Sequence, residues 1–349
     1  SKKIFNLNLL KLLKNIKNVL LYNSGGGLGD SLLMIPIIQW LKDYYQLSKI
    51  HYIQNGIQKH FETSLKDFDN GFVHTINFLP ENYAFFNLTR IRNYSHFKFG
   101  KQILETIGIK KFDLIIDAQT RVNNSLVLKS IPHKYFISPS CRFLLSNPKK
   151  FIYNSRHVCG RIFDYFEKIL NTNISIPTEL NYLQKKYLDE ASKLFKNDKK
   201  YIGFSITSGH PTREKEISLK TIVGVANYFS DKNFVPTFFI EEKYKEKINT
   251  IKTMVQNPYF PEHLVHSPLK NPFLVIAMAK KLHSAISINN GVMHMLGLAG
   301  TKTAIFFDEN SDKFKPLNSN KSKIYFSSKN KETKDLTSED IINFVNDFT

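Results

Sequence analysis

The stretch from residue 18 to residue 42 constrains the fold of this 349-residue chain more than any other. Residues 19–22 form a short apolar run, which is typical of a buried strand. Four glycines follow within five residues, and a helical pattern begins after Asp30. A strand, a glycine loop and a helix start together form a turn that binds anions, because free N–H groups and the helix dipole both attract negative charge. The stretch therefore predicts an α/β fold with an anion site.

Two common nucleotide-binding motifs do not fit this loop. The dinucleotide fingerprint requires a third glycine at the position that Asp30 occupies. The Lys-Ser/Thr pair of a P-loop is also missing after the glycines. An acid at the mouth of a glycine loop suits a reaction that needs both a bound diphosphate and a base.

The composition indicates a folded protein. A hydrophobic content of 42% and 29 Phe exclude a disordered chain, and the length predicts two domains. Cys141 and Cys159 are too few for a disulfide framework, which favours a reducing cytoplasm. No apolar stretch approaches the roughly 18 residues of a membrane span, and lysines interrupt the N-terminal segment, so we expect neither a transmembrane helix nor a secretory signal.

The chain is strongly basic, with a net charge of +19. Such a charge indicates an anionic partner, which is a nucleic acid, an acidic membrane surface or a polyphosphorylated substrate. Codon bias in an AT-rich genome explains the abundance of Lys and Asn equally well. We expect no nucleic-acid partner, because the sequence contains neither an RNP-type aromatic motif nor a recognition-helix pattern.

Strands and helices alternate in two rounds, which predicts two doubly wound parallel sheets. The polar segment 171–181 separates the rounds and predicts a linker. The first round contains expected strands 18–23, 49–54, 72–78 and 112–118, with helices 4–17, 31–45 and 160–170. The second contains strands 201–206, 234–240, 284–288 and 302–307, with helices 184–196, 218–229, 242–255, 272–281 and 292–299. A lysine-rich polar stretch, 311–334, precedes a last helix, for which Thr337 and Asp340 form a capping box.

Two loops in the second half are candidates for a diphosphate site. The first follows strand 201–206 and contains Thr207, Ser208, Gly209 and His210, with the cations Arg213 and Lys215 just before a predicted N-cap at Ser218. An ordinary βα loop with solvated charges is the alternative. The second contains Asn289, Asn290 and Gly291, which permit positive φ and expose amides, and His294 follows one turn into a helix, where a packing role is the alternative.

Acidic residues follow two other strands. Glu241 or Glu242 comes directly after a strand, where a carboxylate commonly meets a ribose or interacts with the next helix dipole. Asp113 and Asp117 flank strand 112–118. Asp117, Gln119 and Arg121 at its exit either shape an acceptor cleft or are ordinary strand-end polar residues.

Metal-binding signals are weak. The pair Asp67 and Asp69 has the D-x-D spacing of some nucleotide-sugar enzymes, but its surroundings are those of a turn. His263 and His266 lie between prolines without further ligands. Neither pair has the number of ligands that a metal site requires, so we expect no metal.

Taken together, these segments resemble glycosyltransferase family nine, the lipopolysaccharide heptosyltransferases. The family's Gly-Asp and following helix, its D-x-x-I-D-x-Q strand, its phosphate-loop lysine and its Gly-x-x-His signature occur in the same order over about residues 18–307. The matching residues are Gly29, Asp30, Leu32, Leu33, Pro36, Leu41, Lys42, Asp113, Ile116, Asp117, Gln119, Lys215, Asn289, Asn290, Gly291, His294, Gly300, Thr303 and Phe306.

The resemblance implies the GT-B fold, in which two Rossmann-like domains face a central cleft. It assigns residues 1–172 to an acceptor-binding domain and 173–349 to a nucleotide-sugar-binding domain, with the last helix crossing back to the first. It also implies an inverting, metal-independent transfer from ADP-heptose to the lipopolysaccharide core, with no cofactor. Asp30 would be the general base, and Gly27 and Gly29 would lie on the acceptor side with Asp117, Gln119 and Arg121. Thr207, Ser208, Gly209, Lys215, Glu241, Asn289, Asn290, Gly291 and His294 would bind the donor.

The sequence departs from the family at two positions. Asn289 replaces the signature Asp, and Glu216 stands where a Trp usually follows Lys215. Another nucleotide sugar, a nucleotide-sugar epimerase of the same fold and a degenerate nucleotide-binding protein therefore remain alternatives. The expected partners are a nucleotide sugar, an anionic core acceptor and the inner face of the inner membrane, to which a cytoplasmic enzyme would bind peripherally.

Overall fold

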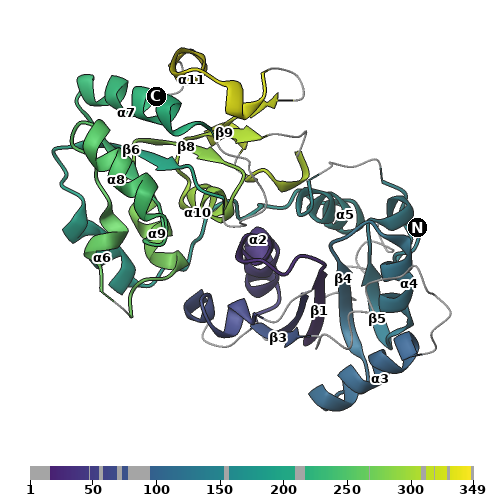
Figure 1. Ribbon diagram of the computed structural model, residues 1–349. Helices are drawn as coiled ribbons and strands as arrows, with labels where there is room; N and C mark the ends of the chain where they lie inside the picture. The colour runs from purple at the N-terminus through teal and green to yellow at the C-terminus, as the bar shows by residue number, and fades with distance from the viewer. Residues whose placement is uncertain are drawn as a thin grey trace. The chain divides into compact units, whose positions relative to one another are not determined.

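The computed structural model describes residues 16–46, 48–54, 58–68, 73–77, 95–152, 157–208, 217–266, 268–307, 312–317, 319–327 and 331–346. The chain divides into two compact units, Ser1–Pro177 and Thr178–Thr349 (Figure 1). The division falls within the predicted linker, five residues after the predicted boundary. Most of the predicted helix 4–17 lies outside the described residues. None of the described helices is long and apolar enough to cross a membrane.

The N-terminal unit contains a five-stranded parallel sheet in the order β3-β2-β1-β4-β5. Its central strands are almost wholly buried apolar runs, as expected for a parallel sheet that is covered on both faces. The strands are β1 (Asn18–Asn23), β2 (Lys49–Gln54), β3 (Val73–Asn77), β4 (Phe112–Asp117) and β5 (His133–Ile137). The helices are α2 (Leu28–Tyr44), α3 (Ser95–Ile107), α4 (Val122–Ser130) and α5 (Gly160–Leu170).

Helices cover both faces of this sheet (Figure 1). Helices α3 and α4 share a buried core with residues of β1, β2 and β4 on one face. Helix α2 lies on the opposite face and packs against α5, where the Trp40 ring lies 4.5 Å from the Phe166 ring and 6.0 Å from the Phe163 ring. The first turn of α2 lies near the carboxyl end of β1, because four residues join the strand to the helix.

The C-terminal unit contains a second five-stranded parallel sheet, in the order β10-β9-β8-β6-β7. Its main core lies between the sheet and the helices α7, α8 and α11, and the helices α6, α9 and α10 pack on one another. The strands are β6 (Lys200–Ser205), β7 (Phe234–Phe238), β8 (Ser284–Ile288), β9 (Thr303–Phe307) and β10 (Ser322–Phe326). The helices are α6 (Lys185–Leu194), α7 (Leu219–Asp231), α8 (Lys245–Met254), α9 (Pro272–Ala279), α10 (Gly291–Ala299) and α11 (Ser338–Val345).

Strands β5 and β10, each of which forms one edge of its sheet, were not predicted from the sequence. Strand β10 lies within the stretch 311–334, which the sequence shows only as polar and rich in lysine. Its residues are all half-buried, because an edge strand is covered less than a central one, and this weakens the apolar signal. Its parallel pairing with β9 depends on a partner strand about twenty residues away.

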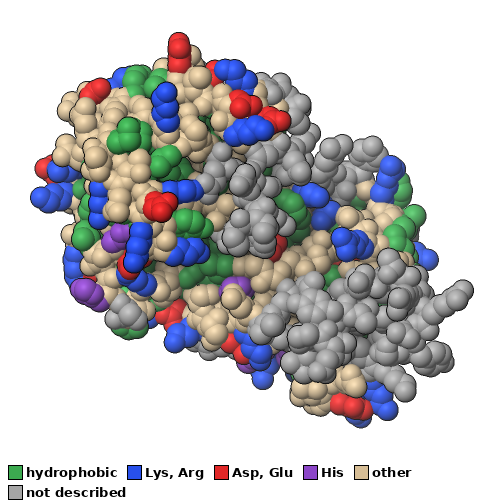
Figure 2. Space-filling model, in the orientation of Figure 1, with side chains coloured by type: hydrophobic (Ala, Val, Ile, Leu, Met, Phe, Trp, Pro, Cys, Tyr) green, Lys and Arg blue, Asp and Glu red, His purple; other side chains and the backbone are tan. Residues whose placement is uncertain are grey.

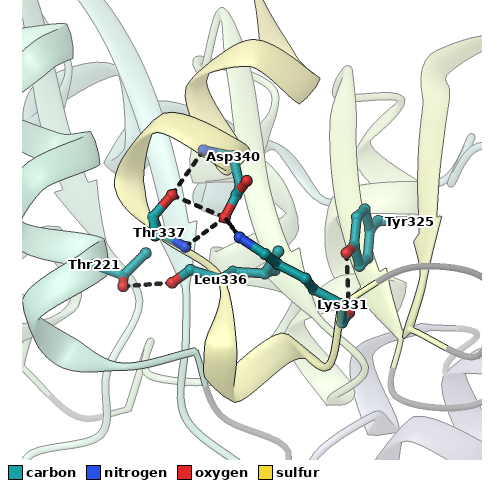
Figure 3. Close-up of polar contacts among 6 residues, drawn as sticks. All are labelled: Thr221, Tyr325, Lys331, Leu336, Thr337 and Asp340. Atoms are coloured by element: carbon teal, nitrogen blue, oxygen red, sulfur yellow. Dashed lines mark hydrogen bonds and ion pairs between the residues drawn. The ribbon is translucent and has the colours of Figure 1, made fainter.

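The last helix, α11, belongs to the C-terminal unit. The predicted capping box is confirmed: Thr337 Oγ1 accepts a bond from Asp340 N, and Asp340 Oδ2 accepts one from Thr337 N (Figure 3). Thr221 Oγ1 on α7 donates to the carbonyl of Leu336 at 2.7 Å. Ile341 and Val345 are fully buried in the core with α7. The apolar face of this helix therefore packs on the C-terminal unit, and the expected crossing to the first domain stays a prediction.

Candidate functional site

Each sheet has a point at which the strand order reverses, and α/β proteins bind ligands at the carboxyl ends of the strands beside such a point. In the N-terminal unit this point lies between β1 and β4, and in the C-terminal unit it lies between β6 and β8. The described candidate residues from the sequence follow these strands or their neighbours. We call the two places the N-terminal and the C-terminal switch point.

Asp30 lies at the N-terminal switch point, in the first turn of α2. The helix begins at Leu28, three residues before the predicted start, so Asp30 is its third residue and not its cap. Its Oδ2 accepts a hydrogen bond from the backbone N–H of Gly27, the actual N-cap, at 3.1 Å. The carboxylate is thus directed back toward the glycine loop.

The glycines of the loop make room for this carboxylate. A Cβ atom at Gly25 would overlap the Asp30 carboxyl group, and one at Gly27 would lie 3.2 Å from its Oδ2. Gly29 lies in the first turn of α2. None of these glycines has a positive φ, since Gly108 and Gly300 are the positive-φ glycines of the described residues. The position of the Asp30 carboxyl group therefore explains why residue 25 is a glycine, and it leaves little space for a side chain at residue 27.

A pair of amide side chains bridges the two strands of this switch point. Gln119 Nε2 donates to Asn23 Oδ1 at 2.6 Å, and Asn23 Nδ2 donates to the carbonyl of Asp30 at 3.1 Å. Asn23 ends β1 and is buried, whereas Gln119 follows β4 and is half-buried. Gln119 was predicted as a site residue, but Asn23 was missed because one amide at a strand end carries no motif.

His60, in the 3-10 helix η2 (His60–Glu62), is a second residue that the sequence did not indicate. Its ring is 5% exposed, and its Nδ1 lies 3.2 Å from Ser64 Oγ. Burial lowers the pKa of His60, while the Gly26 carbonyl and the Asp30 carboxylate oppose that shift. A neutral imidazole therefore borders the glycine loop.

Asp117 is fully buried beneath the N-terminal switch point. Its carboxylate accepts bonds from Ser125 Oγ at 2.6 Å, Ser138 Oγ at 3.0 Å and Gln119 N at 2.9 Å. Burial raises the pKa of Asp117 to about 6, although these bonds favour the charged form. Asp117 thus orients the loop that carries Gln119 and does not itself reach the surface.

Arg121, which was predicted on the acceptor side, follows the carboxyl end of β4, whereas Asp113 lies near the start of the same strand. Arg121 is exposed and is the N-cap residue of α4, next to Gln119 in the chain. Asp113 lies at the other end of β4, where its Oδ2 accepts bonds from Lys17 N at 2.9 Å and Asn18 N at 3.0 Å. Asp113 therefore has a structural role at the start of β4, whereas Asp30 lies at the switch point beside the carboxyl end of that strand.

Asn290 organises the C-terminal switch point. Its Oδ1 accepts a bond from Met293 N at 2.9 Å, which caps α10. Its Nδ2 donates to Ser205 Oγ at 2.8 Å and to the carbonyl of Thr207 at 3.0 Å. The two predicted loops, 207–208 and 289–291, are therefore joined by one side chain.

The backbone of the second loop differs from the expectation of positive φ. Asn290 has a φ of −144°, and neither Asn289 nor Gly291 has a positive φ. A Cβ atom at Gly291 would meet nothing within 4 Å. The first residue of α10 therefore has open space beside it. His294, one turn later, is half-buried.

A third segment reaches the same loop from the carboxyl side of β7. Tyr244 OH donates to the carbonyl of Ser208 at 2.7 Å, a contact that no sequence pattern predicted. Glu241 and Glu242 are both exposed and form ion pairs at 2.6 Å with Lys243 and Lys270, respectively. Both acids are thus accessible, and the geometry does not select one of them for a ribose.

A carboxyl group with a raised pKa lies close to these acids. Burial and the neighbouring Glu241 carboxylate raise the pKa of Glu262 to about 7, and Lys270 opposes that shift. His263 Nε2 lies 2.8 Å from the carbonyl of Ile240, so His263 is bound to the backbone at this point. The described residues contain no group of three or more His, Cys, Asp or Glu side chains that could hold a metal ion.

Several predicted residues lie outside the described part of the chain. Gly209, His210, Arg213 and Lys215 belong to the segment 209–216, and Asp69 of the D-x-D pair belongs to 69–72. The structure therefore describes the start of the first donor loop, Thr207 and Ser208, and its far end from Ile217 onward.

The sequence and the structure were compared with those of known proteins. No protein-family profile and no curated protein matches the sequence. Solved structures do match. A family 9 glycosyltransferase from Veillonella parvula DSM 2008 superposes with a TM-score of 0.65 and 16% identity, covering 96% of this chain and 97% of its own. The E. coli heptosyltransferase WaaC with ADP gives 0.62 and 14%, covering 95% and 100%.

A structure of a different enzyme class also matches. The UDP-GlcNAc 2-epimerase of Methanocaldococcus jannaschii, in complex with UDP-GlcNAc and UDP, superposes with a TM-score of 0.51 and 10% identity, covering 95% of this chain and 92% of its own. At such identities a structural match establishes the fold only. The two parallel-sheet units and these matches together show that this chain has the GT-B fold, as found in family 9 glycosyltransferases.

Proposed function

We propose that this protein is an inverting glycosyltransferase that moves heptose from ADP-heptose to the core of lipopolysaccharide or lipooligosaccharide. The observation that carries the proposal is the different chemistry of the two switch points on one GT-B chain. The N-terminal one presents the Asp30 carboxylate from a glycine loop. The C-terminal one presents a helix N-terminus with open space at Gly291, which suits the diphosphate of a donor.

Asp30 is the proposed base. Its carboxylate takes the proton of an acceptor hydroxyl while that oxygen attacks the anomeric carbon of the donor. The bond from that carbon to the diphosphate oxygen breaks on the opposite side, so the configuration inverts and ADP leaves. Asn23 and Gln119 hold the backbone of Asp30 in place, and Gly27, Gly29 and Arg121 border the acceptor.

The proposed donor site consists of the loops joined by Asn290. Thr207, Ser208 and Gly209 with Lys215, and the amides that follow Asn289 and Asn290, stabilise the diphosphate as its charge develops. His294 lies one turn into the same helix. Glu241 or Glu242 accepts hydrogen bonds from the nucleoside. Neither a resident cofactor nor a metal ion takes part in the proposed step.

A lipid-linked, anionic core acceptor places the proposed enzyme at the inner face of the inner membrane. The helix expected over residues 4–17 and the lysines of segment 311–334 are candidates for contacts with this anionic surface. The heptosyltransferase structures that match this fold include one with an ADP-2-deoxy-2-fluoro heptose, which supports an ADP-sugar as the first donor to test.

The direct test is donor binding followed by transfer. Isothermal titration with ADP, ADP-heptose, UDP and UDP-GlcNAc identifies the nucleotide, and ADP release in the presence and absence of a core acceptor measures transfer. Lys215→Ala should weaken ADP binding about tenfold or more and slow transfer. The matched control is Lys220→Ala, since Lys220 is an exposed lysine in the first turn of α7, and this variant should change neither quantity.

The outcomes separate the alternatives. Binding of UDP-GlcNAc with epimerisation and no acceptor requirement would identify an epimerase, as in the matching M. jannaschii enzyme. Nucleotide binding without any turnover would identify a degenerate binding protein. Unchanged ADP affinity in Lys215→Ala would remove that residue from the site.

A further inference from the structure

The segment 118–163 of the N-terminal unit has an unusual charge distribution. Its 46 residues contain no Asp or Glu and eight Lys or Arg. Arg121, Arg142, Lys149 and Lys150 are exposed. Such a run of one sign gives the surface a positive potential that no carboxylate within the segment offsets.

The same segment exposes large apolar side chains. Of the nine exposed large hydrophobic residues among those described, four belong to it: Val122, Leu126, Leu144 and Phe151, which are 40–57% exposed. Elsewhere such residues stand close to acids, since Tyr44, Leu188 and Leu264 each have an Asp or Glu within two positions. Tyr182 and Met254 have no acid so close, but each is a single exposed apolar residue, whereas segment 118–163 combines four such residues with eight cations and no acid.

Helix periodicity, one hydrogen bond and one cation–π contact bring parts of this segment together. Val122, Leu126 and Lys129 share a stripe of α4, since they are four and three residues apart. Lys129 Nζ donates to the carbonyl of Leu145 at 2.6 Å, next to Leu144. The guanidinium of Arg142 lies 5.4 Å from the centre of the Phe151 ring. Blue and green side chains lie beside one another in the region of α4 (Figure 2).

The backbone at this surface is strained. Cys141, Arg142 and Phe143, in the 3-10 helix η6 (Ser140–Phe143), have φ values of 50°, 55° and 67°. Left-handed backbone is unfavourable for residues with a side chain, and it persists where the surroundings hold it and often where function needs it. Here the Phe143 ring is buried and stacks on the Tyr165 ring at 4.7 Å, while Arg142 and Leu144 on either side are exposed.

We infer that the surface formed by Leu126, Arg142, Leu144, Lys149, Lys150 and Phe151 docks on an anionic lipid bilayer. The lysines and the arginine contact lipid phosphates, and the apolar side chains between them enter the headgroup layer. Basic charge with interspersed Leu and Phe is the combination that holds peripheral proteins on such membranes. This inference adds a docking surface to the proposed membrane association. It rests on the proposed function only for the membrane at which the protein acts, because binding to a bilayer does not require transferase activity.

Co-sedimentation of the full chain with vesicles tests this surface. The wild-type protein should bind vesicles of equal parts phosphatidylglycerol and phosphatidylcholine, and should bind pure phosphatidylcholine weakly. Lys149→Gln with Lys150→Gln should weaken binding about 25-fold at low salt. Phe151→Ser should weaken it about tenfold, with less sensitivity to salt.

Helix α6 offers matched controls. It carries the adjacent exposed lysines Lys185 and Lys186 and the exposed Leu188, but Asp189 and Glu190 follow them. Lys185→Gln with Lys186→Gln, and Leu188→Ser, should leave vesicle binding within twofold of wild type. All substituted side chains are exposed, and thermal unfolding should show unchanged stability.

Three results would overturn the inference. These are equal binding of the wild type to both kinds of vesicle, unchanged binding in either surface variant, and tight binding to single-stranded DNA without binding to vesicles. The vesicle assay contains no donor or acceptor, so a negative result in it says nothing about transfer. Transfer is measured separately, with a soluble, delipidated core acceptor.

Discussion

The two switch points share an architecture and differ in chemistry. Each lies where a five-stranded parallel sheet reverses its order, and at each an Asn side chain bonds across to the neighbouring strand or its loop. At the N-terminal point Asp30 and the backbone of Gly25 are in close contact, which leaves no space for a Cβ. At the C-terminal point Gly291, the first residue of α10, has open space.

This difference shows that glycines at the two switch points can serve different purposes. Gly25 is required because the Asp30 carboxyl group of the same chain occupies the space of its missing side chain. Gly291 is required by no neighbour within the described residues, and its lack of a side chain leaves the helix N-terminus accessible. The first arrangement holds a charged side chain in place, whereas the second leaves room for a ligand.

The largest expected effect is that of Asp30→Asn. The Asn carbonyl oxygen can still accept the bond from Gly27 N, and the Asn side chain fits beside Gly25 because it has the size of Asp. The free energy of unfolding should therefore change by less than about 1 kcal/mol. Asn cannot accept a proton, so turnover should fall by about 10² to 10⁴. ADP release and thermal unfolding measure both quantities. Asp113→Asn, the matched carboxylate of the same unit, keeps an oxygen that can accept the bonds from Lys17 N and Asn18 N, so it should change neither stability nor turnover markedly.

A stable Asp30→Asn protein with near wild-type turnover would leave Asp30 with the role of a helix-capping residue only. The two switch points would then no longer differ in catalytic function.

The next effect concerns the pH dependence of the N-terminal unit. Asp117 has a pKa of about 6 in the folded protein against an ordinary value of 3.8. Because the folded pKa is raised, the protonated form is favoured on folding, and this contribution is present below about pH 4 and lost as the pH rises through 6. The loss amounts to about 3 kcal/mol at neutral pH.

Thermal unfolding from pH 4 to pH 8 checks this prediction. The stability of wild type relative to Asp117→Asn should decrease over this range. Asp113→Asn serves as the control at the other end of β4, and its stability should decrease with pH as that of the wild type does. A parallel pH dependence of wild type and Asp117→Asn would contradict the assignment.

A smaller effect is expected for Asn290→Ala. The variant loses the cap of α10 and both bonds from Nδ2 to the β6 loop, so it should lose about 2 kcal/mol of unfolding free energy. ADP affinity should fall about tenfold, because the two donor loops are no longer joined. The control is Asn271→Ala, since Asn271 Oδ1 caps α9 by accepting bonds from Phe273 N and Leu274 N. It should lose similar stability with unchanged ADP affinity, and equal affinity losses in both variants would make Asn290 a structural cap.

The smallest effect is expected for Gln119→Ala, which removes the bond to Asn23. The stability should change by about 1 kcal/mol. If the bridge positions Asp30, kcat should fall about three- to tenfold while KM for the donor stays the same. An increase in KM alone would instead indicate that Gln119 binds substrate, and no change in either constant would exclude both roles.

Local sequence patterns predicted most elements of this fold correctly. The eight predicted strands all correspond to observed ones, because the central strands are continuous apolar runs between polar loops. The capping box at Thr337 and Asp340 was also found, since both partners lie within one helical turn. The edge strands β5 and β10 and the start of α2 were missed or misplaced. Strand β10 is half-buried and gives a weak apolar pattern, and β5 is short and begins with the polar residues His133 and Lys134. Gly27 caps α2 through its backbone, so the helix has no Ser, Thr, Asp or Asn to mark its start.

The sequence alone determined the alternation of strands and helices, the two sheets and the presence of an acid in a glycine loop. These features depend on residues close together in the chain. Only the tertiary structure showed that Asn23 bonds Gln119, that Asn290 bonds the Thr207 carbonyl and that Asp117 is buried, because these contacts join residues 21 to 96 positions apart. A polar side chain at a strand end looks the same in sequence whether it faces solvent, a neighbouring strand or a ligand. Its role is decided when parallel strands bring distant loops to the same edge of a sheet.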